Sequence, residues 1–60
     1  MKWIILTDSE AKRDVYVQVS HISHIERIKE ETWVYINGKM AFRVFETPRE
    51  IMKEIAGGEQ

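Results

Sequence analysis

The sequence predicts an α+β fold: about five short antiparallel strands forming a strongly bent sheet or small barrel, with one C-terminal helix over residues 48–56. Three observations predict it. Apolar and polar residues alternate over Val15–Ser20, Asn37-Gly38 is typical of a hairpin turn, and Thr47–Glu50 has the pattern of a helix capping box. Sixty residues accommodate only one domain, so residues 1–60 are expected to form a single unit.

The first two strands are separated by a polar connection. Trp3–Thr7 is apolar at nearly every position, which predicts a strand that is central or covered on both sides. Asp8–Asp14 is polar and rich in turn-forming residues, so we expect an exposed loop. In Val15–Ser20 the valines are expected to point inward, and the intervening Tyr16 and Gln18 away from the core.

The segment that follows is compatible with two structures. Isoleucines recur every third residue over Ile22–Ile28, as on a helix face, but the segment is short and β-branched. We therefore expect a turn at Ser20–Ser23 that places Ile22 under the sheet, and then a strand over His24–Lys29. Glu30-Glu31 would form the bend into the next strand.

The stretch around Asn37-Gly38 predicts the central hairpin. Both positions of a type I′ turn require positive φ, which Gly adopts freely and Asn tolerates. A two-residue loop would place Tyr35 opposite Met40. One face of the hairpin would then carry Trp33, Tyr35, Met40, Phe42 and Val44, and the other Val34, Ile36, Ala41 and Phe45.

The C-terminal helix has a defined start and an apolar stripe. In the capping box, the Thr47 hydroxyl accepts from the Glu50 amide and the Glu50 carboxylate accepts from the Thr47 amide. Pro48 fits the first helical position. The stripe expected to dock on the sheet consists of Ile51, Met52, Ile55 and Ala56.

Two apolar hairpin faces exceed what one short helix can cover. With no cysteine in the chain, disulfides cannot supply the missing stability, and association is the remaining common solution. We therefore expect a homo-oligomer, or a complex with a protein partner. The expected interface or binding residues are Trp33, Tyr35, Met40 and Phe42, with Arg43 as an accompanying cation.

Charge and chemistry limit the other functions. Nine Lys and Arg against ten Asp and Glu give a formal net charge of −1, which does not favour nucleic acid as the partner. His21 and His24 lack further ligands with metal-site spacing, and no catalytic set of residues is evident. The apolar run Trp3–Leu6 is too short to span a membrane. We expect a soluble, cytoplasmic, non-enzymatic protein with no metal and no other cofactor.

Two further hypotheses stay open. Trp33, Tyr35 and Phe42 could stack bases or a small nucleotide, helped by Arg27, Lys29 or Arg43, and a nucleotide pocket between subunits would use Trp3 as well. Alternatively, His21 and His24 could support the fold through a metal.

Five short stretches carry a family resemblance: Trp3–Thr7, Val15–Ser20, His24–Ile28, Asn37-Gly38-Lys39 and Glu46–Ile51. Together they resemble the small FlbD-type proteins of flagellar operons, which have similar chains in phage and mobile-element genomes. The resemblance covers nearly the whole length and implies a non-enzymatic accessory protein without catalytic residues. The order of elements is also similar to that of LytTR-type DNA-binding domains and of the CsrA RNA-binding dimer.

Overall fold

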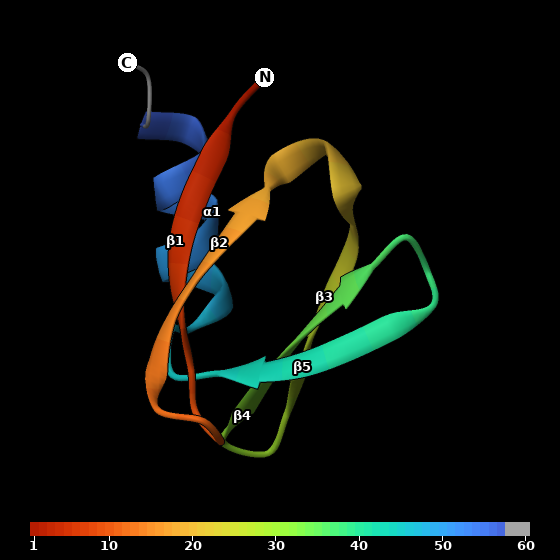
Figure 1. Ribbon diagram of the computed structural model, residues 1–60. Coiled ribbons are helices and arrows are strands. Elements are labelled where there is room, and N and C mark those ends of the chain that lie inside the picture. Colours follow the sequence, from red (N-terminus) through yellow and green to blue (C-terminus); the bar gives the residue numbers. More distant parts are fainter. Residues whose placement is uncertain (58–60) are drawn as a thin grey trace.

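Five antiparallel strands form one sheet, and a single helix follows them, in the computed structural model of the chain, which describes residues 1–57 (Figure 1). The predicted α+β class is confirmed, and the sheet is bent but not closed into a barrel. Its strand order is β2-β1-β5-β4-β3. The elements are β1 (Trp3–Asp8), β2 (Arg13–Gln18), the 3₁₀ turn η1 (Val19–His21), β3 (Ile22–Ile28), β4 (Glu31–Ile36), β5 (Met40–Val44) and α1 (Pro48–Gly57).

The sheet consists of two parts that meet at a narrow junction. β1 pairs with β2 along its full length, and β3, β4 and β5 form a meander, but β1 and β5 pair only at Asp8 and Val44. Figure 1 shows the β1–β2 hairpin crossing β5 at a steep angle. Next to this pair, the Glu46 carboxylate accepts hydrogen bonds from the Thr7 amide (2.9 Å) and the Thr7 hydroxyl (3.0 Å).

Local side-chain chemistry explains the tight turn between β1 and β2. The Asp8 carboxylate accepts hydrogen bonds from the backbone amides of Glu10 (2.8 Å) and Ala11 (3.0 Å). The bond from Ala11, and then that from Glu10, lowers the pKa of Asp8 below its ordinary value. Lys12 adopts the left-handed conformation, with φ of 59°. The polar loop is therefore shorter than predicted, because β1 extends to Asp8 and β2 begins at Arg13.

The hairpin turn confirms the predicted backbone conformation and corrects the predicted register. Asn37 and Gly38 have φ of 54° and 68°, and the Lys39 amide bonds to the Ile36 carbonyl at 3.0 Å, as in a type I′ turn. However, Lys39 stays outside the ladder, and Ile36 pairs with Met40. A shift of one residue reverses the face of every side chain in β5.

The core lies between the two parts of the sheet and the helix. α1 packs against β1 and β3, and Ile51 is its one fully buried residue, with Ile55 partly buried beside it. The remaining members of the core are Ile4, Leu6, Val17, Val34 and Val44. The predicted helix stripe was too wide, since Met52 and Ala56 are exposed.

The helix start is confirmed in detail. The Glu50 carboxylate accepts from the Thr47 amide (2.9 Å), and the Thr47 hydroxyl accepts from the Glu50 amide (3.2 Å). At the other end, the Lys2 ammonium donates to the Ile55 carbonyl, where a cation also complements the helix dipole. In the part of the chain that the structure describes, no helix has the length and apolar character needed to cross a membrane.

Candidate functional site

Trp33 and Arg43, two of the expected interface residues, are partners on the outer face of β4 and β5. They are directly opposite in the register, and the Arg43 guanidinium carbon lies 5.8 Å from the centre of the Trp33 ring. The same guanidinium donates to the Glu31 carboxylate and to the Ser9 hydroxyl, each at 3.0 Å. The positive charge of Arg43 is therefore paired within the chain, and one face of the Trp33 ring is covered.

Tyr35, also expected at the interface, belongs to a second self-contained group. Its ring stacks on the His24 ring with centroids 4.2 Å apart, and its hydroxyl donates to the Glu26 carboxylate at 3.2 Å. Partial burial, and then the Glu26 charge, raise the pKa of Tyr35 above its ordinary value. His24 also approaches Glu26, with 3.5 Å between Nε2 and Oε2. The Tyr35 ring, the Tyr35 hydroxyl and the Glu26 carboxylate therefore have partners within the chain.

Met40 and Phe42 lie on the opposite face, contrary to the prediction that they share a face with Trp33 and Tyr35. The reason is the extra residue in the turn, which pairs Met40 with Ile36 and Phe42 with Val34. Both side chains line an apolar groove beside β2, with a volume of about 380 Å³. Its walls include Trp3, Val15, Tyr16, Val17, Met40 and Phe42. We call this surface the apolar groove.

The side chains around the apolar groove include three large exposed apolar groups. Trp3 is 57% exposed, Tyr16 66% and Met40 60%. β1 lies between β2 and β5 in the strand order, so the predicted central position is confirmed. The alternative prediction, a strand covered on both sides, is wrong, because only alternate residues such as Ile4 and Leu6 are buried and Trp3 is exposed. The alternation in β2 had already placed Tyr16 away from the core. Sequence reasoning therefore contained the signal for Tyr16 but did not connect it to Met40.

β2 contributes a free backbone edge to the apolar groove, because it is the first strand in the sheet order. The Val19 amide donates to the Lys2 carbonyl at 2.9 Å, so Lys2 and Val19 are a hydrogen-bonded pair of the hairpin. Hydrogen-bonded pairs alternate in an antiparallel ladder, so Val17 and Val15 also bond towards β1. The amides and carbonyls of Asp14, Tyr16 and Gln18 consequently point away from β1, towards the free edge.

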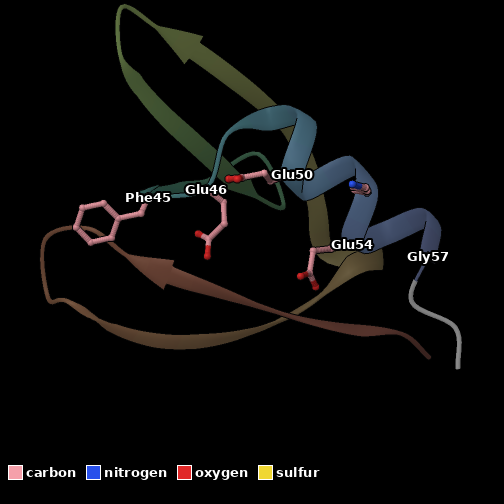
Figure 2. Close-up of a pocket in the computed structure, with 6 residues that line it drawn as sticks. Phe45, Glu46, Glu50, Glu54 and Gly57 are labelled. Carbon is pink, nitrogen blue, oxygen red and sulfur yellow. The ribbon is translucent and has the colours of Figure 1, made fainter.

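A second hollow extends along α1 as far as Gly57 and is lined by three carboxylates and by Lys53 (Figure 2). It has a volume of about 640 Å³, and Figure 2 shows Glu46, Glu50 and Glu54 along it beside Phe45. Two of the three have structural roles, since Glu46 holds the end of β1 and Glu50 caps the helix. This leaves Glu54 alone, so the hollow does not offer a convergent set of acids.

The two histidines lie at separate places. His24 stacks on Tyr35 on the outer face of the meander, whereas His21 lines the apolar groove. Within residues 1–57, no group of three or more His, Cys, Asp or Glu side chains is arranged to hold a metal ion.

Comparison with protein-family models, with curated proteins and with solved structures finds no match to this chain. Information on function therefore comes from three features of the structure: the apolar groove, the three exposed apolar side chains around it, and the free edge of β2.

Proposed function

We propose that the chain is a small non-enzymatic accessory protein of the cytoplasm, similar to FlbD-type proteins, that acts as a homo-oligomer through an apolar surface of its sheet. The observation that carries this proposal is the exposure of Trp3, Tyr16 and Met40 around one apolar groove. The largest apolar patch on a monomeric protein, typically about 300–600 Å², is often functional. Aromatic and Met side chains are favoured anchors in interfaces.

The proposed surface keeps two of the five residues expected from the sequence. Met40 and Phe42 remain, and Trp3 and Tyr16 take the place of Trp33 and Tyr35. This exchange is supported by energetics, because the Trp33 and Tyr35 rings already have partners within the chain. A side chain that has contacts in the free monomer gains less from association than an exposed one.

Nucleic acid is the less favoured ligand for the same outer face. A base that stacked on the covered side of Trp33 or Tyr35 would have to displace Arg43 or His24. Glu26 and Glu31 lie among these rings and would repel a phosphate backbone. Arg43, the cation available there, is paired with Glu31.

Static light scattering tests the proposal. We expect the mass to rise from monomer to oligomer between about 1 μM and about 1 mM, the range of weak association. Tyr16→Ser should weaken association by about tenfold, as expected for an exposed aromatic anchor. The matched control is Ile28→Ser, which removes an exposed apolar side chain from the opposite edge strand and should change nothing. A monomer at every concentration contradicts the proposal.

A further inference from the structure

We infer that a second copy of this chain pairs with the free edge of β2, so that the two β2 strands run antiparallel across a two-fold axis at Tyr16. This inference rests on the proposed homo-oligomer and specifies how it forms. An edge strand with unpaired amides and carbonyls is a template for another strand. Here those groups belong to Asp14, Tyr16 and Gln18, and the sequence around them suits pairing with itself.

The sequence of β2 reads nearly the same in both directions about Tyr16. Val15 and Val17 flank it, and the polar Asp14 and Gln18 come next. In an antiparallel pair centred on Tyr16, each Val15 therefore lies opposite a Val17 of the second copy. Each Asp14 carboxylate lies opposite a Gln18 amide that can donate to it. Like charges do not face each other, as an isologous interface requires.

The outward backbone groups agree with this register. Tyr16 lies opposite Tyr16 of the second copy and Asp14 opposite Gln18, and all three residues direct their amides and carbonyls to the free edge. Each such pair exchanges two backbone hydrogen bonds. A register shifted by one residue would bring Val15 or Val17 opposite these residues, although the valines already bond to β1. The alternation of hydrogen-bonded pairs between β1 and β2 thus excludes the registers shifted by one residue.

The other edge of the sheet is protected against such pairing. β3 has an irregular register between Ile22 and His24, and it carries the charged Glu26 and Arg27 in its middle. Bulges and charged residues are common devices that prevent edge pairing. The corresponding middle of β2 is uncharged, from Val15 to Gln18. The asymmetry between the two edges selects β2.

The size of the surface fits a weak dimer. Trp3 at 57% and Tyr16 at 66% exposure offer roughly 250–300 Å² of aromatic surface per copy, given the area that such rings can bury. Standard interfaces bury about 800 Å² per partner. The aromatic area alone is therefore insufficient, and the backbone bonds and Met40 must contribute. Pairing along β2 supplies both, because the apolar groove follows that edge.

Single-cysteine variants test the register, since the natural chain has no cysteine. Tyr16→Cys should form a disulfide-linked dimer, because opposed residues of a hydrogen-bonded pair lie about 5.5 Å apart, within disulfide range. Asp14→Cys alone and Gln18→Cys alone should not, since their copies would be about 13 Å apart. A mixture of Asp14→Cys and Gln18→Cys should cross-link as a heterodimer while it keeps Tyr16. Ile28→Cys is the control for random collision.

Amide exchange in the natural chain provides an independent readout. At concentrations where the oligomer forms, the Tyr16 and Gln18 amides should be protected, and dilution should remove their protection before that of Val17. An oligomer by light scattering without this cross-linking selectivity overturns the β2 pairing and leaves the proposed function standing. A monomer at every concentration overturns both the proposed homo-oligomer and the β2 pairing. In that case an extended strand of a different protein is the remaining partner for the free edge of β2.

Discussion

Replacing Ile51 by alanine tests whether the helix depends on one buried side chain. Ile51 has no exposed surface and is the one fully buried residue of α1, where it closes the core over β1 and β3. A helix of ten residues is marginal by itself in water, so most of its stability must come from docking. Ile51→Ala removes the largest part of that contact.

The expected loss is a large fraction of the chain's total free energy of unfolding. Truncating a buried Ile to Ala costs about 2–5 kcal/mol of unfolding free energy, because the cavity that remains adds to the lost transfer free energy. A chain of 60 residues has about 3–9 kcal/mol of unfolding free energy at the usual 0.05–0.15 kcal/mol per residue. Alanine is the better helix former, so intrinsic propensity opposes the loss. A measured decrease therefore reports packing.

Urea denaturation followed by circular dichroism, at one fixed protein concentration, measures the effect. We expect the free energy of unfolding to fall by at least about 2 kcal/mol, and Tm by about 8 °C or more. Met52→Ala is the matched control, because Met52 is 56% exposed on the same helix and its truncation should stay within about 0.5 kcal/mol. Equal effects from the two substitutions would refute the dependence of α1 on the docking of Ile51.

Two further predictions concern carboxylates. Glu46→Gln replaces one of two accepting oxygens with a donor, and should lower the free energy of unfolding by about 1–2 kcal/mol, whereas Glu54→Gln should leave the denaturation curve unchanged. The amides of Ala11 and Glu10 lower the pKa of Asp8, so its carboxylate stabilises the fold above the ordinary value of 3.8, and this contribution is lost as pH falls through the lower folded value. The stability difference between the natural chain and Asp8→Asn, measured by urea titration, should therefore disappear in acid; a difference that persists at pH 2 would contradict this linkage.

Strong local signals predicted most of the fold. The capping box at Thr47–Glu50, the alternation in β2 and the positive φ at Asn37 and Gly38 all appear as expected, because each depends on neighbouring residues alone. The turn around Ser20–Ser23 was placed within a residue or two, as η1 over Val19–His21. Strand register depends on how the ladder closes beyond the turn, and local chemistry does not determine this. Lys39 caused the error in register, because it belongs to the turn and not to the ladder.

The error at Lys39 carried through to the candidate site. Met40 and Phe42 moved to the face of the apolar groove, and Trp33 stayed with Arg43 on the outer face. Pairing between distant segments also decided which aromatic groups are free. Arg43 reaches Ser9 across the junction of the two sheet parts, a contact that separation in sequence conceals. Composition showed a surplus of apolar strand surface, and only the three-dimensional arrangement showed that much of it surrounds β2.

The narrow pairing of β1 with β5 has a consequence for how the chain opens. Apart from the shared core, only one residue pair, the Glu46 carboxylate, the Arg43–Ser9 contact and a few backbone bonds connect the two ladders. Cooperative units of native proteins separate where few bonds cross. The shared core must therefore hold the N-terminal hairpin on the meander, and we expect a variant that loosens this core to open the molecule at the β1–β5 junction. Two such opened chains could exchange hairpins, a route to strand-swapped assemblies that needs no new contact surface.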